Sequence, residues 1–239
     1  MSDSHPSLPP DSEVRVLVVD DDPLVRDAYR AFLANAPGYL LCGEARNGAE
    51  GVQAFATLAP DVVLMDLQMP EMSGVDATRE ICSRWPQACV VALTTFGTRE
   101  YVTAALASGA SGYLLKDAGG RALMVGMRQA LAGEMPLSSA VRRELVSTVV
   151  TTALPAREAV EVGLTGRERE LLQWLAQGLT NHQIGSQMYV SEGSVKQYLS
   201  HVGSKLNAKS RTQILVKALQ LGLVDLDRIP LERQDVVER

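Results

Sequence analysis

Apolar, β-branched runs alternate with segments of helical periodicity through the first half of the chain. Short strands are expected at residues 14–19, 39–45, 62–65, 88–94 and 112–115. Helical spacing of apolar residues predicts helices at residues 24–34, 49–58, 75–85, 99–107 and 121–132. Because nearly every strand residue is apolar, both faces of the sheet should be covered. The pattern predicts an α/β doubly wound (βα)5 domain with a parallel five-stranded sheet.

The second half of the chain shows no strand pattern. Helices are expected at residues 166–177, 181–188, 192–207 and 210–221, which predicts a small all-α domain of four helices. The stretch before them combines a helical pattern at residues 139–150 with the sequence TTALPA, and we interpret it as a linker. The expected units are a tail (1–12), an α/β domain (13–132), a linker with a helix (133–160), a helical domain (161–226) and a second tail (227–239).

Charge also separates the two domains. The chain as a whole has a net charge of −5. Residues 13–133 carry ten Lys/Arg and fourteen Asp/Glu, whereas residues 163–224 carry seven Lys/Arg and three Glu. The first domain is therefore acidic and the second basic, and we expect them to bind different partners.

The sequence has no pattern typical of secretion or of a membrane span. Its three cysteines show no CxxC spacing and are interpreted as buried free thiols in a reducing compartment. The start, MSDSHPSLPPDSE, lacks an apolar signal core. No apolar stretch approaches the roughly 18 residues that a spanning helix needs. We expect a soluble, cytoplasmic protein without a membrane partner.

Polar residues with clear chemistry follow the expected strands. Asp20 and Asp21 come after the first strand, Asp66 after the third, Thr94 after the fourth and Lys116 after the fifth. Ligands of open parallel sheets bind outside the carboxyl ends of the strands, so these side chains should share one crevice. Adjacent carboxylates repel each other, but a hard cation such as Mg²⁺ between them removes the repulsion. The sequence therefore predicts a metal site.

A metal next to a further carboxylate, an ammonium group and a hydroxyl is typical of phosphoryl transfer. We expect Asp66 to be the nucleophile that attacks phosphorus and forms an acyl phosphate. Lys116 would neutralise negative charge, and Thr94 would donate a hydrogen bond. The expected metal ligands are Asp21, Asp66, a backbone carbonyl near Gln68 and, through water, Asp20.

Seven sequence segments carry a resemblance to a known family. VVDDDPLVR, VVLMDLQMPEMSGVD, ALTTF and GASGYLLKD, in this order, resemble the receiver domain of bacterial two-component response regulators. LTGREREL, GLTNHQIG and VSEGSVKQYLSHVGSKL resemble the LuxR-type helix-turn-helix. Together they are similar to the NarL/FixJ family over residues 14–224. The resemblance implies Asp66 as phosphoacceptor, a sensor histidine kinase as phosphodonor and Mg²⁺ (or Mn²⁺) as cofactor.

The same resemblance implies roles for three more residues near the crevice. Tyr113 would be the switch aromatic that moves inward when Thr94 turns toward the phosphoryl group. Gln68 and Phe96 would flank the approach of the water that hydrolyses the acyl phosphate. Because the apolar Phe96 cannot orient a water molecule, we expect slow self-dephosphorylation.

In a helix-turn-helix, the second helix lies in the major groove of DNA. Within residues 192–207, an apolar series marks the packed face of this helix: Val195, Leu199, Val202 and Leu206. Lys196, Gln197 and Ser200 lie on another face and are predicted to reach base edges. Contacts to DNA phosphates are expected from Thr180, Asn181, Lys205, Lys209 and Arg211.

The last expected helix presents an apolar stripe of Ile214, Leu215, Ala218 and Leu221. This stripe either completes the core of the helical domain or pairs two copies of the chain. In the NarL/FixJ family the fourth helix can pair two DNA-binding domains, which implies a homodimer on double-stranded promoter DNA. RNA polymerase is a further partner that the resemblance implies.

Two other functions fit part of the sequence. One is a phosphohydrolase of the haloacid dehalogenase type, with Asp20 as nucleophile and Asp22 as acid. That class needs an acidic motif after a late strand, where this chain has Lys116 and Asp117. The other is a DNA-binding protein that dimerises independently of phosphorylation. Our main hypothesis is a response regulator, not an enzyme, with Asp22 as a helix-start carboxylate and Gly74 as a turn former.

Overall fold

The computed structural model describes residues 13–95, 99–137 and 162–225. Its first part contains a five-stranded parallel sheet in the order β2-β1-β3-β4-β5. The strands are β1 (Val14–Val19), β2 (Tyr39–Ala45), β3 (Val62–Asp66), β4 (Val90–Thr94) and β5 (Gly112–Leu115). The predicted fold class is therefore confirmed for the α/β domain.

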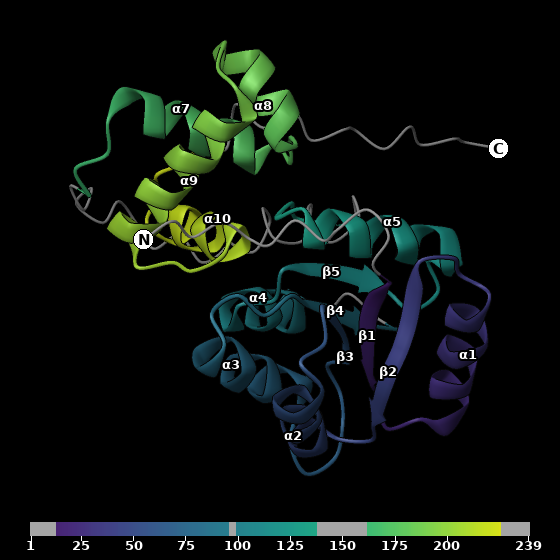
Figure 1. Cartoon of the computed structure of the whole chain (residues 1–239). Coiled ribbons are helices and arrows are strands. Elements are labelled where there is room, and N and C mark those ends of the chain that lie inside the picture. Colours follow the sequence, from purple (N-terminus) through teal and green to yellow (C-terminus); the bar gives the residue numbers. More distant parts are fainter. Residues whose placement is uncertain (1–12, 96–98, 138–161, 226–239) are drawn as a thin grey trace, which may run out of the picture.

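Helices cover both faces of this sheet, as its apolar strands require (Figure 1). One face bears α1 (Pro23–Ala34) and α5 (Gly119–Leu131), and the other bears α2 (Gly48–Leu58), α3 (Gly74–Arg84) and α4 (Arg99–Ser108). Alternate strand residues point to opposite layers. Val16 and Val18 pack in the cluster with α1 and α5, whereas Leu17 and Val19 pack in the cluster with α2 and α3.

The chain that follows α5 returns to the edge of the sheet. The backbone N–H of Tyr113 in β5 donates to the carbonyl of Pro136 over 2.9 Å, and Tyr113 forms a β-bridge with Leu137. Pro136 and Leu137 lie in the predicted linker, but in the structure they pack on the α/β domain. The helix expected at residues 139–150 lies outside the described residues.

Four helices form the second domain: α7 (Gly166–Ala176), α8 (Asn181–Met188), α9 (Glu192–Leu206) and α10 (Arg211–Gln220). Reciprocal side-chain and backbone hydrogen bonds start two of them, between Thr165 and Glu168 in α7 and between Thr180 and Gln183 in α8. The predicted all-α domain is confirmed. Among the described residues, none of the helices is long and apolar enough to cross a bilayer.

The two domains touch through the last helix. Figure 1 shows α10 between the α/β domain and the rest of the helical domain, and α10 packs against α4. The helices α7, α8 and α9 lie on the far side of α10 from the sheet.

Candidate functional site

The ends of β1, β3 and β5 bring two carboxylates and one ammonium group together. Lys116 Nζ lies 2.7 Å from Asp20 Oδ2 and 3.1 Å from Asp66 Oδ2. Asp20 is fully buried, and Asp66 is 5% exposed. Residues that are far apart in the sequence therefore form one charged cluster, where the topology of a parallel sheet places its ligand site.

Burial and charge act against each other on the central carboxylate. Burial raises the pKa of Asp66, the neighbouring Lys116 acts to lower it, and Asp20 acts to raise it, with a net upward shift. Burial acts to lower the pKa of Lys116, but hydrogen bonding to Asp20 and the charge of Asp66 outweigh this and raise it. Lys116 therefore remains protonated between the two carboxylates.

The carboxylates of Asp20, Asp21 and Asp66 can each offer an oxygen, and these three oxygens lie within 4.8 Å of one another. Asp21 is exposed while the other two are buried, so the group opens toward solvent on one side. Mg²⁺ takes carboxylate oxygens and keeps several water ligands, which an open, all-oxygen site permits. The donor set therefore fits the predicted divalent cation.

Two neighbours hold the loops around this cluster in place. Arg26 Nη1 donates to the backbone carbonyls of Asp20, over 2.6 Å, and of Asp21, over 3.0 Å. Asp22 caps α1, because its carboxylate accepts from the Leu24 amide over 2.8 Å. The helix-start role of Asp22 is confirmed, whereas the role of Arg26 had no signal in the sequence pattern.

Gly74 gives the loop after β3 the space it needs. A Cβ atom built at Gly74 would lie 1.7 Å from the carbonyl oxygen of Asp66. The Gly74 amide donates to the Leu67 carbonyl over 3.2 Å, which fixes the start of α3 against the loop. Gly74 does not have a positive φ. The predicted turn conformation is thus corrected, since the glycine is required for close approach of two backbones.

The predicted switch residues lie next to the carboxylate cluster. Thr94 is 2% exposed and Tyr113 is fully buried. Burial raises the pKa of Tyr113 to about 12, the interaction with Thr94 opposes the rise, and the charge of Asp66 adds to it. Tyr113 is therefore an interior side chain, and its role as a switch stays a prediction. Gln68 is exposed, with its amide 3.4 Å from Asp66 Oδ1, and Phe96 lies outside the described residues.

The helix α9 has the two faces that its sequence predicts. Val195, Leu199, Val202 and Leu206 are buried in the core of the helical domain. Lys196, Gln197 and Ser200 are exposed. The packed face is thus confirmed, and the three candidate base contacts lie open to solvent.

The candidate phosphate contacts divide into accessible and internal residues. Asn181 and Arg211 are buried, and Arg211 donates to the side chain of Asn181 and to the carbonyl of Leu179. Lys205 Nζ lies 2.7 Å from the carboxylate of Glu168, which is also buried. Burial lowers the pKa of Arg211 to about 10, and Glu134 opposes this effect. Asn181 and Arg211 therefore hold each other inside the helical domain in this structure, and their role as phosphate contacts stays a prediction.

Lys205 is itself exposed, and the other two candidate phosphate contacts are also reachable. Lys209 is exposed, and Thr180 is partly exposed while its side chain caps α8.

The apolar stripe of α10 is also internal. Ile214, Leu215 and Ala218 are at most 4% exposed and belong to the core of the helical domain, whereas Leu221 is 38% exposed. The stripe therefore completes the core, which was one of the two expected roles. The use of these residues in dimerisation stays a prediction, and of the four only Leu221 is exposed in this structure.

Comparison with known proteins supports both halves of this description. A family model for the "Response regulator receiver domain" matches residues 16–128, and one for "Bacterial regulatory proteins, luxR family" matches residues 162–218. The uncharacterized transcriptional regulatory protein YxjL of Bacillus subtilis (strain 168) is 37% identical over 89% of this chain and 98% of its own. The nitrate/nitrite response regulator protein NarL of Escherichia coli (strain K12) is 34% identical over 84% and 93%.

A solved structure is also similar. The response regulator ChrA of a heme-sensing two-component system is 33% identical, with a TM-score of 0.50 over 89% of this chain and 99% of that one.

Proposed function

The chain belongs to the NarL/FixJ family of response regulators, with a receiver domain followed by a LuxR-type DNA-binding domain, and we propose that it accepts a phosphoryl group on Asp66 and then binds promoter DNA as a dimer. One observation carries the proposal. The buried carboxylates Asp20 and Asp66 share the ammonium group of Lys116 at the ends of three strands. This arrangement provides a nucleophile and a positive charge at the same point.

Asp66 supplies the nucleophile. One of its carboxylate oxygens bonds to phosphorus while the P–N bond of a phosphohistidine breaks and the imidazole leaves with that electron pair. Lys116 faces one oxygen of Asp66 at 3.1 Å, and the amide of Gln68 faces the other at 3.4 Å. Both can offset negative charge on the phosphoryl oxygens as the transfer proceeds.

A divalent cation fits the same site. When bound, it supplies charge neutralisation for the phosphoryl oxygens. Asp20, Asp21 and Asp66 would hold it, because their oxygens already lie within 4.8 Å of one another. The donor would be a sensor histidine kinase, the phosphodonor that a receiver domain implies.

Phosphorylation then acts on the DNA-binding domain. Thr94 and Tyr113 adjoin Asp66 and couple its modification to the rest of the receiver. The exposed Lys196, Gln197 and Ser200 of α9 would read base edges in the major groove. Dimerisation would place two such helices on a two-fold operator.

The test combines labelling and DNA binding in the same samples. Wild type is treated with a small-molecule phosphodonor and Mg²⁺, the labelled residue is mapped by mass spectrometry, and binding to promoter fragments is followed by gel shift. We expect one phosphoryl group on Asp66 and tighter binding to a subset of fragments. Asp66→Asn should show neither effect, whereas the control Asp27→Asn, an exposed carboxylate on α1, should behave as wild type.

Two outcomes would support the alternatives. Multiple turnovers of an aryl phosphate would favour a phosphohydrolase, although Asp20 is fully buried and paired with Lys116, and Asp22 caps α1. DNA binding by Asp66→Asn equal to that of phosphodonor-treated wild type would favour a receiver that dimerises without phosphorylation.

A further inference from the structure

The loop that follows the proposed phosphoacceptor contains a strained residue. Residues 67–73 connect Asp66 to α3 and are here called the acceptor loop. Within it, Glu71 has a φ of 65°, in the left-handed region that residues other than glycine seldom adopt. The Met72 amide donates to the Pro70 carbonyl over 2.7 Å, which is the pattern of a classic γ-turn, a rare and strained turn. Such a conformation persists only where the surrounding contacts hold it.

The neighbouring loop supplies these contacts. Arg46 and Asn47 connect β2 to α2 and are here called the β2–α2 loop. Asn47 is 5% exposed, and its Nδ2 donates to Glu71 Oε2 over 3.2 Å. The hydrogen bond to Glu50 raises the pKa of Arg46, and the negative charge of Glu71 adds to the rise. The strained residue therefore faces an amide donor and a positive charge.

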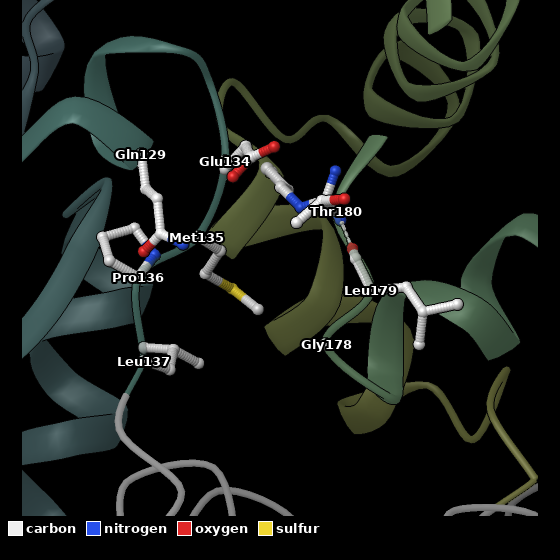
Figure 2. A pocket seen from close by; sticks show the side chains of 9 residues that line it. Gln129, Glu134, Met135, Pro136, Leu137, Gly178, Leu179 and Thr180 are labelled. Atoms are coloured by element: carbon white, nitrogen blue, oxygen red, sulfur yellow. Dashed lines mark hydrogen bonds between the residues drawn. The ribbon is translucent and has the colours of Figure 1, made fainter. Parts of the chain in front are cut away.

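The two loops also meet through the backbone where α2 begins. The Gly48 amide donates to the Met72 carbonyl over 3.1 Å, and a Cβ atom built at Gly48 would lie 2.6 Å from that carbonyl oxygen. Packing at the domain boundary is looser, since a cavity of about 90 Å³ remains there, with Glu134 and Thr180 at its wall (Figure 2). At Gly48 there is no room for one added carbon atom, so a shift of one loop moves the other.

A second hydrogen bond fixes the orientation of the Asn47 side chain. Its Oδ1 accepts from the Glu50 amide over 2.8 Å and so caps α2. The oxygen is thus used by α2, and the nitrogen is directed at Glu71. A carboxylate at this position could still cap α2, but it would face Glu71 with a like charge and without a donor.

The acceptor loop carries groups that the proposed reaction uses. The Gln68 amide lies 3.4 Å from Asp66 Oδ1, and the Gln68 carbonyl is an expected metal ligand. The Leu67 amide donates to the carbonyl of Leu93 in β4 over 3.3 Å, and the Gly74 amide donates to the Leu67 carbonyl over 3.2 Å. These bonds fix the two ends of the loop, so the contacts at its strained turn fix the span between them.

We propose that the β2–α2 loop holds the acceptor loop in the shape that binds the cation and the phosphoryl group, and that Asn47 is the positioning residue of this contact. The inference rests on the proposed function, which supplies both groups. Asn47 acts through Glu71 and touches neither group. Without the hydrogen bond, the strained turn relaxes, and the Gln68 carbonyl leaves its place beside Asp66.

The first pair of variants acts on Glu71 and leaves the cap of α2 intact. Glu71→Ala removes the acceptor, whereas Glu71→Gln keeps an acceptor oxygen and removes the same charge. Binding of Mn²⁺ alone is followed by electron paramagnetic resonance of the free ion, and Asp21→Asn identifies the Mn²⁺ bound at this site. We expect Mn²⁺ to bind about tenfold more weakly to Glu71→Ala than to Glu71→Gln. Labelling of Asp66 by a small-molecule phosphodonor should slow by about the same factor.

The second pair reverses the direction of the hydrogen bond. Asn47→Asp keeps the cap but sets two carboxylates against each other. In Asn47→Asp/Glu71→Gln, the new amide at position 71 can donate to the new carboxylate at position 47, and the net charge equals that of wild type. Asn47→Asp should bind Mn²⁺ about tenfold more weakly than wild type, and the double variant should return to within about twofold.

Charge and position predict opposite results for Asn47→Asp. An added carboxylate near the site attracts a cation, so its charge alone would tighten Mn²⁺ binding. Weaker binding therefore reports a displaced loop. Gln53→Glu makes the same change from amide to carboxylate at an exposed position of α2 and should match wild type. Chemical denaturation of each variant measures stability alongside.

Three results would overturn the positioning role. The first is equal Mn²⁺ binding by Glu71→Ala and Glu71→Gln, which decides the matter even if Asn47→Asp does not fold. The second is Mn²⁺ binding by Asn47→Asp that is as tight as in wild type or tighter. The third is a double variant that binds no better than Asn47→Asp, which would assign the effect to the cap of α2. The proposed function fails separately, if treated wild type carries no phosphate on Asp66 while the differences in Mn²⁺ binding remain.

Discussion

Lys116 Nζ lies closer to Asp20 than to the proposed phosphoacceptor Asp66, at 2.7 Å against 3.1 Å. The lysine thus neutralises a fully buried carboxylate in addition to facing the nucleophile. Asp20 and Asp66 would otherwise repel each other in a poorly solvated site. The ammonium group therefore has a structural role as well as a chemical one.

Removal of this charge should affect stability and chemistry together. Lys116→Met leaves two buried carboxylates without their counter-ion, and we expect a loss of about 3 kcal/mol in the free energy of unfolding. Mg²⁺ should restore more stability to the variant than to wild type, because a cation replaces the missing charge. Labelling of Asp66 should slow by roughly a hundredfold. Thermal unfolding with and without Mg²⁺ and the rate of labelling measure these effects, with the exposed Lys209→Met as control.

The raised pKa of Asp66 predicts a direction for the dependence of stability on pH. Because its folded-state pKa lies above the unfolded value, the folded state binds the proton more tightly, and stability falls as pH rises through the folded pKa. Asp66→Asn removes this penalty. The variant should unfold at a higher temperature than wild type at neutral pH, and the difference should shrink on acidification below the folded pKa. A difference that grows on acidification would contradict the direction of the shift.

The space at Gly74 predicts a steric effect on the phosphoacceptor loop. Gly74→Ala places a Cβ atom 1.7 Å from the Asp66 carbonyl oxygen, so the backbone must move. We expect a loss of at least about 2 kcal/mol in stability and slower labelling of Asp66. Gly166→Ala is the matched control, because no atom lies within 4 Å of its Cβ and its φ is not positive. This control should be neutral or stabilising by up to about 1 kcal/mol.

Lys196 and Lys205 lie on the same helix but should respond differently to substitution. Lys196 is exposed, so Lys196→Met should weaken DNA binding and relax base preference by about 1–3 kcal/mol while leaving stability unchanged. Lys205 pairs with the buried Glu168, so Lys205→Met should lower the stability of the domain. Gel shifts at several salt concentrations measure the effect of each variant on DNA binding, and chemical denaturation measures its effect on stability. An unchanged salt dependence in Lys205→Met would agree with a role in pairing with Glu168 rather than with DNA phosphates.

The pair formed by Lys205 and Glu168 also predicts acid sensitivity of the helical domain. Burial acts to raise the pKa of Glu168, but hydrogen bonds from Lys205 and Thr165 outweigh it and lower the pKa below the usual 4.5. The resulting stability is present above the unfolded pKa and is lost as pH falls through the folded pKa. Stability measured against pH should fall in this acid range in wild type and less steeply in Glu168→Gln. An equal slope in both proteins would show that another group controls the loss.

Much of the fold and of the receiver site could be predicted because its determinants are local. The apolar strands specify the sheet, and the sheet brings Asp20, Asp66 and Lys116 together from positions across the sequence. Val195 and Leu206 mark the packed face of α9 by spacing alone. Such features follow from periodicity and from strand ends, which a single sequence displays.

Other features depend on contacts that periodicity does not encode. Arg211 looked like a phosphate contact, but it is buried between Asn181 and the Leu179 carbonyl. Ile214 and Val216 lie two positions apart on one helix, yet one faces the core of the helical domain and the other faces the receiver. A helix with apolar residues on two faces does not reveal which partner each face has. Only the packing of the domains decides that.

The return of the chain to β5 after α5 bears on how this domain can be isolated. β5 is an outer strand, and strands at that position can join those of another molecule unless something covers them. Here the Pro136 carbonyl accepts a hydrogen bond from the Tyr113 amide. A fragment that stops at residue 132 would leave this amide without its acceptor, and we expect it to self-associate through β5. A monomeric fragment therefore has to extend at least through Leu137.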